Sequence, residues 1–118
     1  MIVKVRMSAF AEESYPSDIQ IREVDIPNQE WEQVADRNKL DDRLELVFHY
    51  GQNPIQAVPQ CYSVSVGDVI EFFGKLYMVM SLGFREITEE QYKKYIAIPL
   101  IDRAWIAYTV TKNEEVPF

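Results

Sequence analysis

One segment of the chain, residues 50–62, combines side-chain amides with tyrosines, and these residue types suit the recognition of a nucleotide. An amide donates and accepts hydrogen bonds at once, as the edge of a base does, and a tyrosine ring offers a face for stacking. The residues that we expect to line such a pocket are Tyr50, Gln52, Asn53, Gln60 and Tyr62. The alternative is an ordinary polar loop whose amides bond to its own backbone.

Arg85 is a further candidate for ligand binding, because a guanidinium presents paired donors to a phosphate or a carboxylate. It follows Gly83 and Phe84 in a segment that we expect to be a strand. The alternative for this side chain is a cross-strand ion pair with a carboxylate such as Glu71.

Familiar catalytic and metal-binding patterns are missing from the sequence. With one histidine and one cysteine, the chain has no quartet of nitrogen and sulfur ligands for structural zinc. Nucleophile-elbow, phosphate-loop and dinucleotide-binding motifs are also missing. We therefore expect no catalytic residue, no metal and no cofactor. The alternative is a metal-dependent enzyme that cleaves nucleotides or nucleic acids with His49, Asp68, Glu71 and Glu86.

Aromatic residues make up 13% of the chain, which is more than a core of this size needs. Some of them are therefore expected to line a groove or an oligomer interface. The candidates for this interface are Tyr92, Tyr95 and Trp105, with a homo-oligomer as one possible assembly.

The formal charge of −7 argues against a protein that holds duplex nucleic acid, because neutralising phosphates needs clustered Lys and Arg. The longest apolar runs are far shorter than a membrane span, so we expect no membrane association. A lone cysteine, Cys61, and an N-terminus without the features of a secretory signal indicate a cytoplasmic protein.

The elements that must position these residues follow the order β, β, α, α, β, β, α, β. The first two strands are expected at 2–10 and 19–26, with a bulge near Arg22 and Glu23, where the apolar phase shifts by one residue. Two helices at 27–37 and 40–50 follow. Strands at 63–73 and 76–81 form a hairpin with Gly74 as the first residue of a type II′ turn, and 84–87 continues the return strand. A helix opens with a capping box at Thr88 and Gln91 and runs to about Ile96, and Pro99 prevents its continuation before a last strand at 104–111.

This order predicts an α+β fold. We expect a strongly bent antiparallel sheet or a small β-barrel, with two to three short helices packed on one side. A single domain covers residues 1–112, and residues 113–118 form a C-terminal tail.

Part of the chain resembles short proteins of phages, plasmids and conjugative elements, including YodL-like proteins. The resemblance covers residues 44–90 and rests on residues 49–53 (HYGQN), 63–70 (SVSVGDVI) and 83–87 (GFREI), together with Gly74 and Tyr77. It implies a protein that interferes with host machinery.

These observations lead to the hypothesis of a small non-enzymatic binding protein that counters host defence. It sequesters a nucleotide-type signal in a pocket, or it occludes a defence protein with a flat, aromatic-centred surface that has an acidic rim. The alternatives are the metal-dependent enzyme above and a structural or regulatory accessory protein of a phage.

Overall fold

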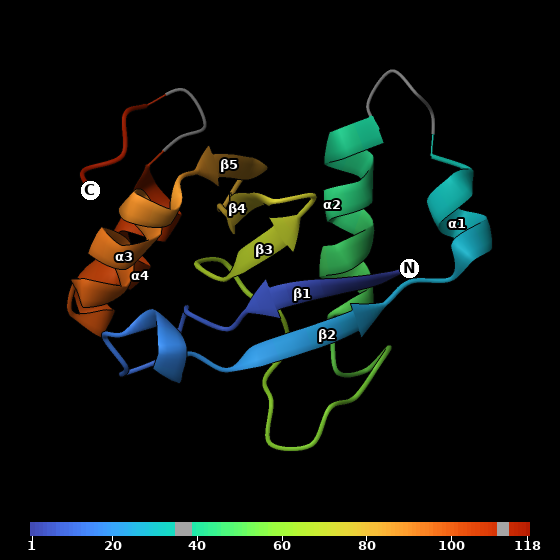
Figure 1. The fold of residues 1–118 in the computed structure, drawn as a ribbon, viewed down its shortest axis with the longest axis horizontal. Coiled ribbons are helices and arrows are strands. Elements are labelled where there is room, and N and C mark those ends of the chain that lie inside the picture. Colours follow the sequence, from blue (N-terminus) through green and yellow to red (C-terminus); the bar gives the residue numbers. More distant parts are fainter. Residues whose placement is uncertain (35–38, 111–113) are drawn as a thin grey trace.

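The structure is a computed structural model that describes residues 1–34, 39–110 and 114–118 (Figure 1). The strands are β1 (Ile2–Arg6), β2 (Ile21–Asp25), β3 (Val69–Phe72), β4 (Lys75–Val79) and β5 (Phe84–Ile87). The helices are α1 (Asn28–Glu32), α2 (Lys39–Tyr50), α3 (Glu89–Ala97) and α4 (Leu100–Thr109), with a short 3-10 helix at Pro16–Asp18.

The five strands form one bent antiparallel sheet in the order β2-β1-β3-β4-β5. Strands β2 and β5 are its edges, so the sheet is not closed into a barrel. The predicted α+β class with a bent antiparallel sheet is therefore confirmed, and the alternative of a small barrel is wrong.

Helices cover both faces of this sheet rather than one. Val5 and Ile70 pack in one apolar cluster with Leu44 of α2, whereas Val69 packs in a second cluster with Tyr92 of α3. Figure 1 shows α2 on one side of the strands and α3 with α4 on the other. The prediction of two to three helices on one side is wrong, because the described residues form four helices and these lie on both faces of the sheet. The buried run at the end of β4 agrees with two covered faces, because a strand covered on both sides is apolar throughout.

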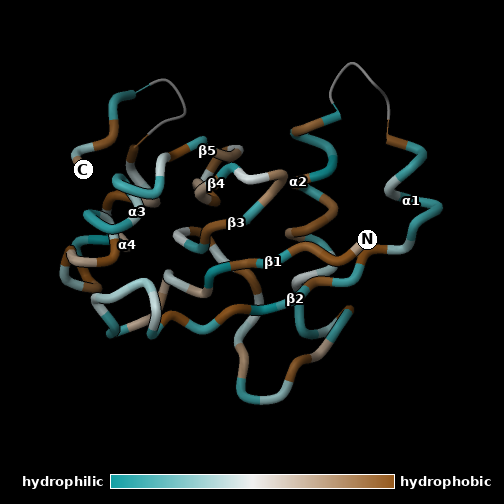
Figure 2. The backbone as a smooth tube through the Cα atoms, viewed as in Figure 1, coloured by the Kyte–Doolittle hydropathy of each residue, from teal (hydrophilic) through white to brown (hydrophobic). Residues whose placement is uncertain are grey.

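Strand β2 has no bulge. Its register with β1 is unbroken, from Ile2 opposite Asp25 to Arg6 opposite Ile21. The apolar phase shifts because Arg22 occupies an inward position, with 1% of its surface exposed, while Ile21 faces outward. Figure 2 shows the alternation of hydrophobic and hydrophilic residues along β1 and β2. The predicted bulge is therefore wrong, and a buried cation explains the pattern.

The predicted hairpin between β3 and β4 is present, with a different turn. Phe72 pairs with Lys75, so Phe73 and Gly74 are the two central residues. Both have positive φ angles, 47° and 76°, which is typical of a type I′ turn. Gly74 is thus the second turn residue, and the predicted type II′ turn is wrong.

The last predicted strand is wrong, because Leu100–Thr109 forms helix α4. Pro99 was expected only to end the preceding helix, but its fixed φ also suits the start of the next one. The capping box of α3 is confirmed, since the Thr88 hydroxyl accepts from the Gln91 amide and the Thr88 amide donates to the Gln91 side chain.

The C-terminal residues pack on the domain. Val116 is buried, and the Phe118 ring lies 5.3 Å from that of Tyr95. The first helix, predicted over 27–37, is shorter than expected, because α1 ends at Glu32. Residues 35–37 of that prediction and the tail boundary at 112/113 lie outside the described residues. Within the described part of the chain, no helix combines the length and the apolar character that a membrane crossing needs.

Candidate functional site

The amide-rich loop after α2 is anchored from inside the protein by Arg22. One terminal nitrogen of this guanidinium donates to Asn53 Oδ1 and to the Tyr62 carbonyl, each at 2.8 Å. The other donates to the Gln56 carbonyl. The Asn53 amide nitrogen in turn donates to the Cys61 carbonyl at 2.8 Å. The polar atoms of Asn53 are therefore used to hold the loop on strand β2.

The other two internal amides have similar structural roles. Gln52 Nε2 donates to the carbonyls of Phe48 and Val64, at 2.8 and 2.9 Å. Gln56 accepts from the backbone N–H of Asp25 and donates to the carbonyl of the same residue. Its side chain thus pairs with the free edge of β2 as a neighbouring strand would. These bonds favour the polar-loop alternative over a nucleotide pocket in this segment.

The remaining predicted pocket residues point in different directions. The Tyr50 hydroxyl donates to Glu30, and Gln60 lies exposed in the loop with a φ of 60°. Tyr62 lines a hollow of about 360 Å³ beside residues 10–13. Arg85 donates to the Glu114 carbonyl and lines a separate hollow of about 310 Å³. The structure does not bring the six predicted ligand-binding residues together around one cavity.

Asp68 is a buried carboxylate that fixes the loop before β3. Its Oδ1 accepts from the Ala9 amide at 2.9 Å and from the Tyr62 hydroxyl at 3.0 Å, and its Oδ2 accepts from the Ser65 amide at 2.8 Å. Burial raises the pKa of the Asp68 carboxyl to about 6, although each of these hydrogen bonds lowers it. This side chain ties the residues after β1 to the start of β3.

The four residues of the enzyme alternative lie in separate places. His49 is exposed on α2, and Asp68 is buried. Glu71 accepts from Arg6, whereas Glu86 lies 3.6 Å from the ammonium of Lys75. No group of three or more potential metal ligands occurs among residues 1–34, 39–110 and 114–118.

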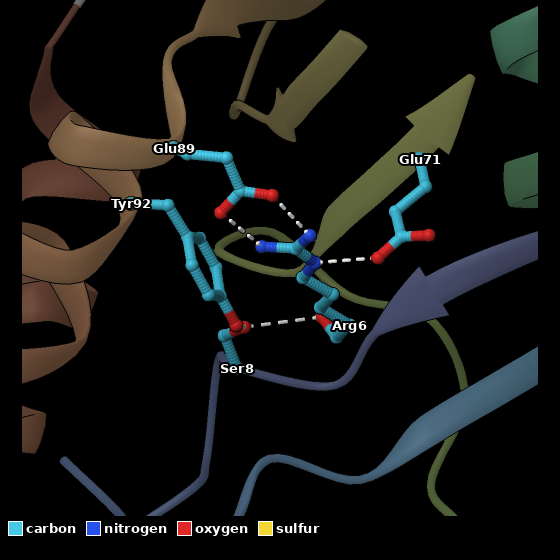
Figure 3. A network of polar contacts seen from close by, with 5 residues as sticks. All are labelled: Arg6, Ser8, Glu71, Glu89 and Tyr92. Carbon is cyan, nitrogen blue, oxygen red and sulfur yellow. Dashed lines mark hydrogen bonds and ion pairs between the residues drawn. The ribbon is translucent and has the colours of Figure 1, made fainter. Parts of the chain in front are cut away.

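Arg6 joins β1, β3 and α3 in a polar network on the second face of the sheet (Figure 3). Its Nε donates to Glu71 at 2.6 Å, and its two terminal nitrogens donate to the two carboxylate oxygens of Glu89. The guanidinium lies 4.6 Å from the centre of the Tyr92 ring, and the Tyr92 hydroxyl is 2.6 Å from the Ser8 hydroxyl. Arg6 lowers the pKa of the Glu89 carboxyl through its hydrogen bonds. The network holds the start of α3 against the sheet.

The three predicted interface residues are divided between core and surface. Tyr92 and Tyr95 are fully buried in the cluster under α3, so they do not face a partner. Trp105 has 71% of its surface exposed on α4. The structure thus leaves one of the three at the surface.

Trp105 belongs to an apolar surface that we call the α4 patch, formed by Leu82, Ile101, Trp105 and Tyr108. Their exposed fractions are 85%, 80%, 71% and 58%. Residues 101, 105 and 108 follow the spacing i, i+4, i+7, which places them on one side of the helix. The Ser81 hydroxyl donates to the Tyr108 carbonyl at 3.1 Å, so the β4–β5 turn that carries Leu82 lies beside this helix.

The charges of α4 are unevenly placed around this patch. Asp102 is exposed, whereas Arg103 is 1% exposed and donates to the carbonyls of Ser8 and Ala11. Sequence reasoning missed Ile101 and Tyr108 because this segment was interpreted as a strand. In a strand, Trp105 and Tyr108 point to opposite faces and form no common surface. The helical spacing of these residues was the available signal.

Comparisons of this chain with protein-family models, curated proteins and solved structures gave no match. The resemblance to YodL-like proteins therefore stays a prediction.

Proposed function

We propose that this protein is a small non-enzymatic binding protein that occludes the surface of a partner protein. The observation that carries the proposal is the α4 patch, where α4 exposes Ile101, Trp105 and Tyr108 on one side and the turn bonded to this helix exposes Leu82. Contiguous exposed apolar groups on a small domain are typical of interaction sites. Trp and Tyr also dominate the energetic centres of protein interfaces.

The charge of the chain indicates what kind of partner fits the patch. The net charge is −7, and the exposed ionic group on α4 is Asp102, while Arg103 is turned inward. A partner with an apolar centre and a basic rim is complementary to this surface. A second copy of the chain is less suitable, because it brings another −7 and a second Asp102 to the same interface.

The biological setting comes from the sequence alone. The resemblance to proteins of mobile elements favours a host protein in the cytoplasm as the partner. Among host proteins, a defence protein is the class whose inhibition benefits such an element. A partner from the same phage is the accessory-protein alternative. Either partner, from the host or from the same phage, would bind the α4 patch through an apolar centre and a basic rim.

A binding experiment on one purified partner tests this proposal. The wild-type chain is used to capture proteins from a host lysate, and each candidate is then purified and titrated against the chain by calorimetry. We expect Trp105→Ala to weaken the complex at least tenfold, as expected for a central aromatic residue. We also expect added salt to weaken it. The matched control is Tyr15→Ala, which removes an equally exposed aromatic ring outside the patch.

Two results would contradict the proposal. One is a partner that binds the Trp105→Ala chain as tightly as the wild type. The other is a concentration-dependent dimer, seen by sedimentation, that Trp105→Ala dissociates, since the patch would then bind a second copy.

A further inference from the structure

The two edge strands of the sheet differ in how their outward backbone groups are used. In β2, the N–H and the carbonyl of Asp25 point away from β1, and both bond to the Gln56 side chain. Strand β5 is the opposite edge and lies at the top of the sheet in Figure 1. Its outward groups are the ones to follow, because a free strand edge is a template for pairing with another chain.

The register of the β4–β5 hairpin identifies the outward groups of β5. The Met80 amide donates to the Gly83 carbonyl, and hydrogen-bonded pairs recur at every second residue of an antiparallel ladder. Arg85 is therefore bonded to β4, whereas Phe84 and Glu86, on either side of it, direct their N–H and carbonyl groups away from β4. Within the described part of the chain, these four groups have no hydrogen-bond partner.

The hollow of about 310 Å³ described above lies beside this edge, on the face of the sheet that α2 covers. The apolar residues that line it are Leu40 and Leu44 of α2, Tyr77 of β4 and Phe84 of β5. A peptide laid along β5 directs every second side chain toward this hollow. Strand addition works in this way, since main-chain bonds give affinity and pockets for alternate side chains give specificity. We call the free edge of β5 and this hollow together the β5 groove.

The charged groups of the β5 groove favour a basic ligand. Glu86 lines the hollow, and its contact with Lys75 is 3.6 Å long between side chains that are 56% and 61% exposed, so this ion pair is weak and replaceable. Asp41 adds a second carboxylate to the lining. Arg85 points to the opposite face of the strand, where it donates to the Glu114 carbonyl. A Lys or Arg opposite Glu86 forms a cross-strand pair of opposite charges.

A second copy of the chain does not suit this edge. The antiparallel register that bonds all four outward groups of both copies pairs residue 84 of one with residue 86 of the other. It places Arg85 directly opposite Arg85 of the second copy, and like charges directly opposite are destabilising. Each copy also brings a net charge of −7.

We infer that the β5 groove binds an extended peptide segment of another protein, which adds to the sheet as a further strand. The segment carries an apolar residue opposite Phe84 and, two positions away, a Lys or Arg opposite Glu86. Its main chain bonds to the outward N–H and carbonyl groups of these two residues. The inference goes beyond the proposed function and does not rest on the α4 patch.

The probe is a library of random seven-residue peptides displayed on phage and selected on the immobilised wild-type chain. We expect the enriched peptides to contain an apolar residue two positions from a Lys or Arg. One enriched peptide is then synthesised and titrated into the ¹⁵N-labelled chain. The amides of Phe84 and Glu86 should shift, and they should exchange with solvent at least tenfold more slowly in the complex.

Variants of the chain separate the parts of the groove. Glu86→Pro removes an outward N–H and a carboxylate but no bond to β4, so the peptide affinity should fall at least tenfold in a folded chain. Glu23→Pro is the matched control, because Glu23 has the same outward position on β2 as Asp25, and it should leave the affinity unchanged. Leu40→Ala should lower the affinity severalfold. Trp105→Ala should leave it unchanged, which separates this groove from the α4 patch.

A second measurement tests the main-chain pairing without altering the protein. Only alternate N–H groups of an added strand face β5. Methylating the peptide nitrogens one at a time should therefore abolish binding at every second residue and lower the affinity less than threefold at the residues between.

The inference is overturned if the selection enriches no peptide, or if the enriched peptide shifts residues elsewhere, such as those of the α4 patch. It is also overturned if a folded Glu86→Pro chain binds the peptide as tightly as the wild type, or if methylation shows no alternation. A concentration-dependent dimer that Glu86→Pro dissociates would make a second copy the occupant and would equally contradict it.

Discussion

The buried Arg22 offers the most direct test of how this fold is held together. We expect Arg22→Met to destabilise the protein, because its guanidinium donates three hydrogen bonds to residues 53–62. Hydrogen bonds from a charged donor contribute about 1.5–3 kcal/mol each. Removing the charge also removes the cost of burying a cation, which offsets part of this loss.

We expect a net loss of about 3 kcal/mol in the free energy of unfolding. In this variant the carbonyls of Gln56 and Tyr62 and the side-chain oxygen of Asn53 all lose the hydrogen bond that Arg22 donates. For 118 residues the unfolding entropy is about 0.25 kcal/mol/K, so Tm should fall by about 12 °C. Urea unfolding and thermal scans measure both quantities. Amide exchange should speed up within residues 53–62 before it does so in β3 and β4.

Two further variants make this result interpretable. Glu23→Gln, on the same strand with its side chain exposed, should change the stability by less than about 0.5 kcal/mol. Arg22→Lys keeps the charge but not the forked donors, so it should also be destabilising. An Arg22→Met chain as stable as the wild type would refute the reasoning, because burying the cation would then cost as much as its hydrogen bonds return.

Three more predictions follow from single residues. The pKa of Asp68 is raised from 3.8 to about 6 by burial, so its stabilising contribution is full below pH 3.8 and is lost as the pH rises through 6. Between pH 4 and 7 the ionisation of this group should cost about 3 kcal/mol of stability. The free energy of unfolding, measured with urea at several pH values, should therefore depend less on pH in Asp68→Asn than in the wild type. Phe73→Asn should raise Tm by about 4 °C, since relieving a left-handed bulky residue returns about 1 kcal/mol; an unchanged Tm would mean that the turn is not strained. Trp105→Ala should change the free energy of unfolding by less than about 0.5 kcal/mol, because the ring is largely exposed; a larger loss would assign the ring to the fold rather than to a partner.

Local signals in the sequence determined several elements well. Residues 40–50 have helical apolar spacing and end at a glycine, and the structure has α2 at Lys39–Tyr50. Thr88 and Gln91 predicted a capping box that is present. These features depend on residues within about ten positions of one another, where backbone preference and hydrophobic periodicity act directly.

The same local signals were insufficient around Pro99. A proline there is compatible both with the end of one helix and with the start of the next. The spacing of Ile101, Trp105 and Tyr108 distinguishes a helix from a strand only when all three are considered together. Which side of α4 is covered was decided by Arg103, whose partner Ser8 is 95 residues away.

The sequence by itself determined an acidic α+β domain with an antiparallel hairpin and a capped helix. Only the tertiary structure decided which polar side chains are used internally and which aromatic rings reach the surface. Asn53 is bonded to Arg22, 31 residues away, and the Tyr95 hydroxyl to the Gly67 carbonyl, 28 residues away. A buried polar group must find a partner wherever the folded chain brings one close, and that proximity is not written in the spacing of neighbouring residues.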